Sequence, residues 1–204
     1  IHRPRMFPYD TLPIYTFRAE LKKEMEKDRL NKGNNFSDIT WTNIGPSGVI
    51  YDAPAPQWGE LSGRIRGIAV HPTDPNTVYI ATASGGIWKT TNGGQSWSDI
   101  ASELPSLTYG AIAIDPNNPN IIYAGGGEIL FGVTAPYYYE GAGLYKSVDG
   151  GTTWNQITNG FGSVTHFGDV EVSPHNSNLV FAALGSGNLF NNNLPNEGIW
   201  RSTD

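Results

Sequence analysis

The architecture of this chain is encoded most clearly in one octapeptide, Ser147-Val148-Asp149-Gly150-Gly151-Thr152-Thr153-Trp154. A near-copy precedes it, Thr90-Thr91-Asn92-Gly93-Gly94-Gln95-Ser96-Trp97, and a third copy starts at Ser202-Thr203-Asp204. Self-similarity at a period of about 40–60 residues indicates an array of supersecondary units rather than one irregular domain. The sequence therefore predicts a repeat protein.

Each repeat carries three strand-like runs before the octapeptide and one after it. The first runs alternate and end at a proline: Ile68–Pro72, Ile112–Pro116 and Val170–Pro174. The second runs are apolar: Thr77–Ala81, Ile121–Ala124 and Leu179–Ala182. The third runs lead into the octapeptide: Gly86–Lys89, Gly143–Lys146 and Gly198–Arg201. The fourth runs read W-x-x-I: Trp97–Ile100, Trp154–Ile157 and, with no repeat before it, Trp41–Ile44. Four antiparallel strands per unit make a β-propeller blade.

The residue types of the octapeptide suit a tight turn between antiparallel strands. Two Gly-Gly pairs supply positive φ angles, and Asn92 or Asp149 can accept hydrogen bonds from turn N–H groups. The Ser and Thr hydroxyls offer further local bonds. We expect Trp97 and Trp154 to bury their rings against the next blade. A single carboxylate per turn, which is Asn92 in the first copy, is too little ligand for a hard metal ion.

The octapeptide resembles the Asp-box of β-propellers, which occurs in sialidases, sortilin-type receptors, xyloglucanase-type glycosidases and secreted bacterial repeat proteins. The resemblance implies an all-β fold in which the motif is structural. The motif residues are Thr90, Asn92, Gly94, Ser96, Trp97, Ser147, Asp149, Gly151, Thr153, Trp154, Ser202 and Asp204. We expect a partial propeller over residues 41–204, with a closing strand at 41–46. The blades are expected at about 65–104, 111–160 and, truncated, 169–204, so the chain is expected to be the N-terminal part of a longer protein.

Composition excludes several classes of function. A net charge of −6 with 16% charged residues leaves no basic footprint for nucleic acid. The sequence contains no run of about 18 apolar residues, so no transmembrane segment is predicted. The chain has no cysteine, which argues against a eukaryotic extracellular domain and is neutral for a bacterial surface protein. It does not begin with Met, so we expect either that a signal peptide has been removed or that the start was not observed.

Residues 1–40 form a separate N-terminal arm. It opens with the basic, aromatic segment His2–Tyr9, and the only helical pattern follows over Phe17–Leu30. Lys32-Gly33-Asn34-Asn35 then ends the helix. Two readings stay open: a helix or tail that packs on the propeller, or a docking element through which residues 1–30 join an outer-membrane or surface complex.

Further segments narrow the resemblance. Trp41–Pro46, Gly63–Val70 and Gly85–Thr90, after a charged helix, are similar to large secreted repeat proteins of Bacteroidota, which are commonly exported by the type IX pathway. The resemblance implies a secreted or outer-membrane-associated protein. Asp10-Thr11-Leu12 also resembles the O-glycosylation site of that phylum, which makes Thr11 a candidate for modification.

Counting strand reversals predicts where the long loops lie. The loops at 50–62, 128–141, 161–168 and 186–197 should share one face, opposite the two Gly-Gly turns. Long aromatic and polar loops on a rigid scaffold are usual binding sites. The candidate ligand-binding residues are Trp58, Tyr137, Tyr138, Tyr139 and His166. A packing role is the alternative for the tyrosines and for His166.

Three functions remain open from the sequence. The first is a non-catalytic propeller that binds a protein or a glycan. The second is a glycoside hydrolase of xyloglucanase or sialidase type, for which Glu128 and Glu140 are the plausible carboxylate pair on the loop face. Gly63-Arg64-Ile65-Arg66 departs from the R-I-P motif of sialidases, and Arg64 and Arg66 leave the same strand face. The third is an accessory subunit or cargo of an outer-membrane machinery. No catalytic residue, metal or cofactor is assigned.

Overall fold

The computed structural model describes Lys23 and residues 41–45, 49–50, 60–61, 64–128, 140–161, 165–185 and 197–203. The chain divides into two compact units, Ile1–Asn43 and Ile44–Asp204. Lys23 is helical and exposed, and it falls within the helix predicted at Phe17–Leu30. The rest of the predicted helix and the candidate Thr11 lie outside the described residues.

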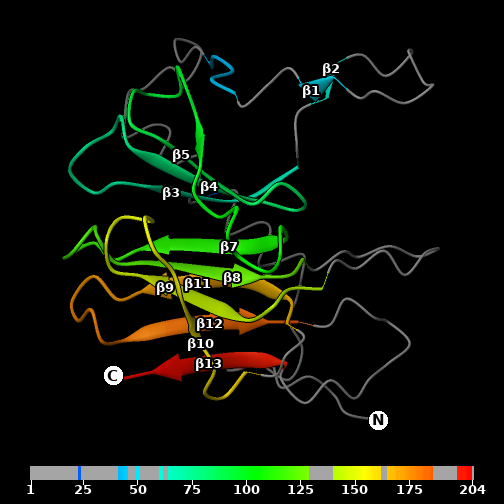
Figure 1. The fold of residues 1–204 in the computed structure, drawn as a ribbon. Coiled ribbons are helices and arrows are strands. Elements are labelled where there is room, and N and C mark those ends of the chain that lie inside the picture. Colours follow the sequence, from blue (N-terminus) through cyan, green and yellow to red (C-terminus); the bar gives the residue numbers. More distant parts are fainter. Residues whose placement is uncertain are drawn as a thin grey trace. The chain divides into compact units, whose positions relative to one another are not determined.

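The second unit is built from antiparallel sheets, which confirms the all-β prediction (Figure 1). The strands are β1 (Val49–Ile50), β2 (Glu60–Leu61), β3 (Ile65–Val70), β4 (Val78–Thr82), β5 (Ile87–Thr90), β6 (Ser98–Asp99), β7 (Tyr109–Ile114), β8 (Ile122–Gly126), β9 (Leu144–Ser147), β10 (Asn155–Ile157), β11 (Phe167–Val172), β12 (Val180–Leu184) and β13 (Gly198–Ser202). Blade 1 has the order β3-β4-β5-β6, blade 2 the order β7-β8-β9-β10, and blade 3 the order β11-β12-β13. These are the strands that the three repeats predicted.

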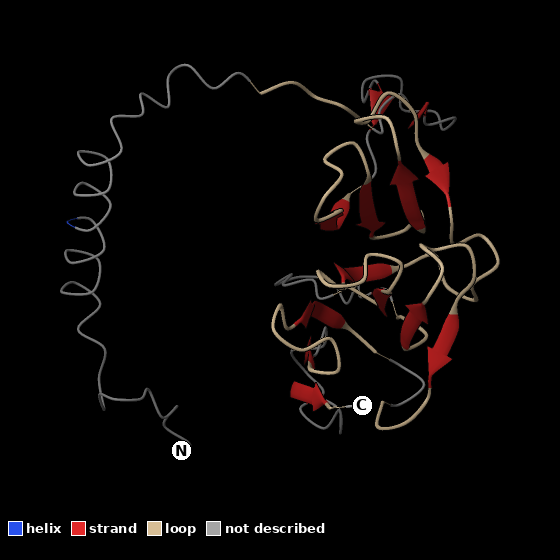
Figure 2. Cartoon of the chain, turned by 90° about the vertical axis from the view of Figure 1, so that its left-hand side faces the viewer, coloured by secondary structure: helices blue, strands red, loops and turns tan. Residues whose placement is uncertain are grey.

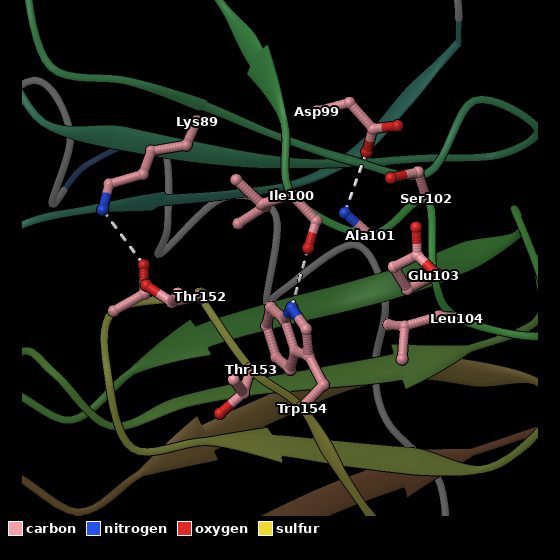
Figure 3. A pocket seen from close by; sticks show the side chains of 12 residues that line it. Lys89, Asp99, Ile100, Ala101, Ser102, Glu103, Leu104, Thr152, Thr153 and Trp154 are labelled. Atoms are coloured by element: carbon pink, nitrogen blue, oxygen red, sulfur yellow. Dashed lines mark hydrogen bonds between the residues drawn. The ribbon is translucent and has the colours of Figure 1, made fainter.

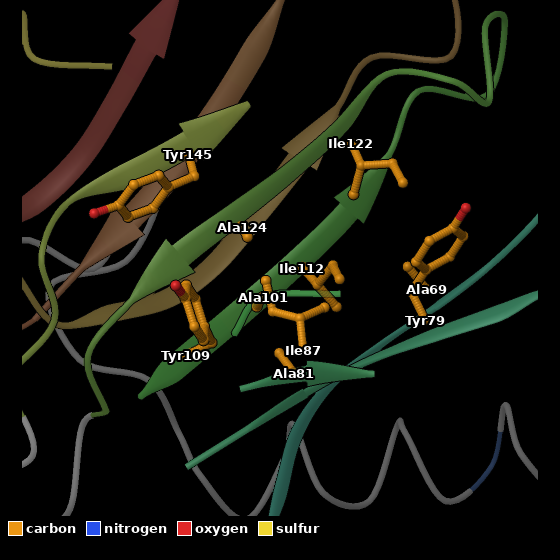
Figure 4. Close-up of a cluster of buried hydrophobic side chains, with 10 residues drawn as sticks. All are labelled: Ala69, Tyr79, Ala81, Ile87, Ala101, Tyr109, Ile112, Ile122, Ala124 and Tyr145. Atoms are coloured by element: carbon orange, nitrogen blue, oxygen red, sulfur yellow. The ribbon is translucent and has the colours of Figure 1, made fainter. Parts of the chain in front are cut away.

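Blade 2 lies between blades 1 and 3 (Figures 1 and 2). The first strands of the blades adjoin one another, because β7 contacts both β3 and β11. One core cluster joins blade 1 to blade 2 and includes Tyr79, Ile87 and Ile112 (Figure 4). A second cluster joins blade 2 to blade 3 and includes Ala113 and Val170.

Side chains alternate between the two sides of each sheet, as the period of a strand requires. On β7, Ile112 packs in the cluster with blade 1, whereas Ala111 and Ala113 pack in the cluster with blade 3. Each blade therefore has a backward face, toward the preceding blade in the chain, and a forward face, toward the following one.

Two expectations about strands were wrong. Residues 41–45 form no strand, although Trp41–Ile44 was predicted to be an outermost one. The motif W-x-x-I predicts a strand only where a third strand offers its backbone hydrogen bonds, as β5 does for β6. Conversely, β1 and β2 form a small antiparallel pair at the two ends of the segment 50–62, which was expected to be a loop.

Candidate functional site

The second Asp-box turn is closed by Ser147 and Asp149. The Ser147 Oγ accepts hydrogen bonds from the Gly151 N–H at 2.8 Å and the Asp149 N–H at 3.3 Å, and donates to Asp149 Oδ1 at 2.8 Å. The Asp149 carboxylate accepts from the hydroxyl of Thr153 at 2.6 Å and from its N–H at 2.8 Å. These bonds, led by the Thr153 hydroxyl, lower the pKa of Asp149 to about 2.

The first Asp-box makes the same turn with an amide in place of the carboxylate. The Thr90 Oγ1 accepts from the Gly94 N–H at 3.0 Å and donates to Asn92 Oδ1 at 2.9 Å. Asn92 Oδ1 accepts from the Ser96 N–H, and Asn92 Nδ2 donates to the Ser96 hydroxyl, both at 2.9 Å. The direction of this last bond differs between the two boxes, and the second box has one more bond, from the Thr152 hydroxyl to the Asp149 carbonyl at 3.0 Å. The prediction of a local hydrogen-bonded turn is confirmed, and Ser202 begins the third copy at the end of β13, while Asp204 lies outside the described residues.

The tryptophan of each box donates its indole hydrogen bond to the preceding W-x-x-I segment, not to the following blade. Trp154 Nε1 donates to the Ile100 carbonyl at 2.9 Å, and Trp97 Nε1 donates to the Ile44 carbonyl at 3.2 Å. Ile44 and Ile100 are the last residues of successive W-x-x-I segments. The expectation that the rings bury against the next blade was therefore wrong: Trp154 docks on the preceding blade and is half-buried (Figure 3). Ile44 takes the place toward blade 1 that Ile100 takes toward blade 2, although Ile100 directly follows a strand and no strand precedes Ile44 in residues 41–43.

The second glycine of each box contacts the isoleucine whose carbonyl accepts the hydrogen bond from the tryptophan of that box. An added Cβ on Gly151 would lie 2.6 Å from Ile100 Cδ1, and one on Gly94 would lie 2.8 Å from Ile44 Cβ. Both glycines also have φ near +90°, at +88° and +89°. A side chain at either position is excluded both by the backbone conformation and by the preceding segment.

Blade 1 also donates hydrogen bonds to the box of blade 2. Tyr79 Oη and Lys89 Nζ both donate to the Gly150 carbonyl, at 3.1 Å and 3.0 Å. The Lys89 ammonium lies 5.1 Å from the Tyr79 ring centroid. A pocket of about 570 Å³ opens beside this contact and is lined by Lys89, Asp99, Ile100, Ala101, Ser102, Glu103, Leu104, Gly150, Gly151, Thr152, Thr153 and Trp154 (Figure 3). A second pocket of about 560 Å³ lies at the corresponding place between blades 2 and 3 and includes Lys146. Because the pocket recurs with the repeat, it belongs to the blade-to-blade contact.

Backbone hydrogen bonds show which loops share a face. The Asp-box turns bond to the turns after the first strands, with Gly93 N–H to Asn76 O at 3.0 Å and Gly150 N–H to Asn120 O at 2.9 Å. At the opposite ends of the strands, the Gly185 N–H donates to the His166 carbonyl at 3.1 Å. In the described residues, the starts and ends of the long loops therefore lie opposite the Asp-box turns, as the strand count predicted. We call this side the long-loop face.

An ion cluster joins blades 1 and 2 on the long-loop face. Glu128, which follows β8, is fully buried. Arg64 binds both of its carboxylate oxygens, with Nε to Oε1 at 2.8 Å and Nη2 to Oε2, and Arg66 Nε lies 3.3 Å from Oε1. The bidentate geometry is the strong form of an arginine–carboxylate pair. The sequence placed the two arginines on one strand face but gave no sign that Glu128 was their partner.

The ion cluster stands at the foot of the long insertion in blade 2. The insertion leaves β8 and returns to β9 at one point: a Cβ on Gly141 would lie 1.9 Å from both the Gly126 carbonyl carbon and the Gly127 nitrogen. Gly141 also pairs with Thr165 as an antiparallel bridge, and Thr165 Oγ1 accepts from the Gly143 N–H at 2.9 Å. The two described ends of the insertion, at Glu128 and Glu140, thus meet in a closed, hydrogen-bonded stem.

The structure places one of the five ligand-binding candidates. His166 is buried, at 4% exposure, next to Thr165 and below the surface of the long-loop face. Burial lowers the pKa of His166, and the nearby Glu140 carboxylate opposes that effect. Trp58, Tyr137, Tyr138 and Tyr139 lie outside the described residues. A role in ligand binding stays a prediction for all five.

The carboxylate pair proposed for hydrolysis is split between two environments. Glu128 is buried in its ion pairs, whereas Glu140 is exposed. In the described part of the chain, no group of three or more His, Asp or Glu side chains is arranged to hold a metal ion. Among these same residues there is also no helix long and apolar enough to cross a membrane.

Comparison with known proteins places the fold in a family. The sequence model of Sortilin-Vps10, described as sortilin, neurotensin receptor 3, matches residues 55–193, which is more than half of the chain. The chain belongs to the Sortilin-Vps10 family. The match spans the strands of blades 1 and 2, together with β11 and β12 of blade 3.

Relatives of this Sortilin-Vps10 chain include glycosidases and a sorting protein. A xyloglucanase of Hypocrea jecorina is 33% identical over 105 residues, covering 50% of this chain and 11% of the relative. A probable oligoxyloglucan-reducing end-specific xyloglucanase of Neosartorya fischeri is 26% identical over 140 residues, covering 65% of this chain and 16% of the relative. The vacuolar protein sorting/targeting protein 10 of Mycosarcoma maydis is 29% identical over 112 residues, covering 49% and 7%.

One solved structure is also similar to this chain. The crystal structure of an ancestral GH74 enzyme superposes with a TM-score of 0.50 at 26% identity, covering 71% of this chain and 18% of that enzyme. The chain thus spans less than a fifth of the length of each of these relatives.

Proposed function

We propose that the long-loop face of this propeller binds an extended ligand, a glycan or a protein, without catalysing a reaction on it. The closed stem of the blade 2 insertion carries this proposal. Gly141 meets Gly126 and Gly127 backbone to backbone and pairs with Thr165. A loop that leaves a rigid scaffold at one point can present its side chains at low entropic cost.

The aromatic content of that insertion supports ligand binding. Tyr137, Tyr138 and Tyr139 follow one another between Glu128 and Glu140. Tyrosine offers a large amphipathic surface and loses little rotamer entropy on binding. The ion cluster of Arg64, Arg66 and Glu128 supports the same proposal, because it ties the foot of the insertion to blade 1.

The relatives favour a polysaccharide as the ligand class. The xyloglucanases among them are named for a branched glucan, and aromatic side chains on an open face suit the apolar faces of sugar rings. A polymer of this kind is met outside the cell, so we propose a secreted or cell-surface location for the protein.

Glycoside hydrolysis is the second candidate, and the names of the relatives favour it. Hydrolysis needs two carboxyl groups that flank the scissile bond. Both oxygens of Glu128 are held by arginine N–H groups and the side chain is fully buried, so a sugar has no access to this carboxylate. This arrangement makes binding the better supported of the two functions.

Affinity electrophoresis in gels that contain xyloglucan tests the proposal, with hydroxyethylcellulose as the control polymer and a reducing-sugar assay on the same sample. Retardation by xyloglucan without new reducing ends is the expected result. Release of reducing ends that survives Glu128→Gln would establish a hydrolase with other catalytic residues. If the chain migrates unretarded in every polysaccharide gel, the glycan ligand is wrong.

A further inference from the structure

The chain contains two Asn-Gly dipeptides, Asn92-Gly93 and Asn159-Gly160, which differ in how tightly the fold holds them. The first lies in the Asp-box turn of blade 1, and the second follows β10 at the start of the connection from blade 2 to blade 3. An asparagine before a glycine is open to attack by the next backbone nitrogen, because glycine has no side chain that blocks the approach. The two dipeptides therefore offer the same chemistry in two different settings.

Hydrogen bonds hold Asn92 and Gly93 in place. Asn92 Oδ1 accepts from the Thr90 hydroxyl and from the Ser96 N–H, both at 2.9 Å, and Asn92 Nδ2 donates to the Ser96 hydroxyl at 2.9 Å. The Gly93 N–H donates to the Asn76 carbonyl at 3.0 Å. The amide group that would leave and the nitrogen that would attack are both engaged, so a reaction at Asn92 requires the turn to open first.

Asn159 and Gly160 are not held in this way. Both residues are exposed, and in the described part of the chain no hydrogen bond engages the Asn159 side chain or the Gly160 N–H. Gly160 has φ of +92° in a bend after β10. Base in the solvent can therefore take the Gly160 amide proton, and the Asn159 side chain can rotate toward that nitrogen without breaking a hydrogen bond.

We propose that Asn159 is a site of deamidation through a cyclic imide, and that the Asp-box protects Asn92 from the same reaction. The Gly160 nitrogen, having lost its proton, attacks Asn159 Cγ; the Cγ–Nδ2 bond breaks, and the nitrogen leaves with the proton as ammonia. Water then opens the imide at one of its two carbonyl carbons. One opening gives aspartate, and the other gives isoaspartate, in which the backbone runs through the former side chain.

Isoaspartate at this place weakens the packing of blade 3 on blade 2. It lengthens the backbone by one carbon atom directly before Gly160, where an added Cβ would lie 3.4 Å from the Trp200 ring of β13. The ring centroid of the next residue, Phe161, lies 5.3 Å from those of both Phe167 and Trp200. A longer backbone displaces Phe161 from these two rings of blade 3.

The new charge is the smaller change. Asn159 lines the pocket between blades 2 and 3 together with Lys146 and Arg201. Both products replace a neutral amide by a carboxylate, and this pocket already carries two cations. The aspartate product is therefore tolerated, and the isoaspartate product is the one that loosens the contact.

Incubation of the native chain in heavy-oxygen water at mildly alkaline pH, followed by peptide mass spectrometry, tests the site. The imide route incorporates heavy oxygen into the product. We expect conversion at least about tenfold faster at Asn159 than at Asn92, because opening the Asp-box turn breaks several hydrogen bonds at once. In urea the two rates should become similar. No conversion of Asn159, equal rates in the native protein, or a difference that persists in urea would overturn the proposal.

Thermal unfolding of the incubated chain tests the consequence. Its midpoint should fall as isoaspartate accumulates, which a protease that cleaves before aspartate but not before isoaspartate measures. Asn159→Gln reacts far more slowly and should keep its midpoint after the same incubation, and fresh Asn159→Asp should match the unmodified chain. An unchanged midpoint after conversion, or an equal loss in Asn159→Gln, would refute the loosening of the blades. A lower midpoint of fresh Asn159→Asp would assign the effect to charge and refute the role of the backbone.

Discussion

The contact between an Asp-box and the preceding blade can be tested at Gly151. An alanine there must adopt φ near +89°, which costs an L-residue about 1–2 kcal/mol. Its Cβ would also lie 2.6 Å from Ile100 Cδ1, so the Ile100 side chain must leave its rotamer at a cost of about 1 kcal/mol. We therefore expect Gly151→Ala to lower the free energy of unfolding by about 2–3 kcal/mol.

Gly150→Ala is the matched control for the backbone cost. Gly150 has φ of +70°, and the atoms nearest to its added Cβ lie 3.6 Å away, which is ordinary contact. This variant should lose only the backbone cost of about 1–2 kcal/mol. Truncating Ile100→Ala removes the crowded atom, so the double variant with Gly151→Ala should recover about 1 kcal/mol relative to the sum of the single variants.

Urea unfolding followed by tryptophan fluorescence gives these free energies from the midpoints at a common slope. Equal losses for Gly151→Ala and Gly150→Ala, together with no coupling to Ile100→Ala, would refute the reasoning. The Asp-box would then stabilise its own turn without contacting the preceding blade.

Three further outcomes follow from the same contacts. Asp149 has a folded pKa of about 2 against an ordinary value of 3.8, so its contribution is complete above pH 3.8 and is lost as the pH falls toward 2; Asp149→Asn should remove this part of the acid dependence in pH titrations of the unfolding midpoint. Arg64→Ala leaves the buried Glu128 carboxylate short of its main partner and should cost about 2 kcal/mol in urea unfolding, less than a fully buried pair because the arginine is half exposed; no loss would show that the pair is only a surface contact. Trp154→Phe keeps the ring but loses the indole hydrogen bond, so it should cost about 1 kcal/mol by the same assay, and a loss no larger than that of a distant surface change would contradict the backward docking.

The sequence predicted the fold because its signals are local and repeated. The Gly-Gly pairs, the Ser147 hydroxyl and the Asp149 carboxylate act within one turn, so their spacing alone predicts the geometry. Alternating runs such as Ile68–Val70 predict strands for the same reason. Two copies of each signal then fix the order of strands in every blade.

Contacts between repeats were less predictable. The Trp154 ring could pack forward or backward with the same local sequence, and only the blade stacking decides which. The ion pair of Arg64 with Glu128 joins residues far apart in the chain, so no pattern in either segment announces it. Trp41–Ile44 shows the converse, because a strand motif without a neighbouring sheet does not form a strand.

The most direct test of ligand binding on the long-loop face compares two variants in xyloglucan affinity electrophoresis. Replacing Tyr137, Tyr138 and Tyr139 by alanine removes the aromatic surface of the insertion, and Asp149→Asn changes the opposite face. The account predicts at least a tenfold loss of affinity, about 1.4 kcal/mol, for the tyrosine variant with little change in its melting temperature, and no loss for Asp149→Asn. Equal affinity of the tyrosine variant and the unmodified chain, or a loss confined to Asp149→Asn, would contradict it.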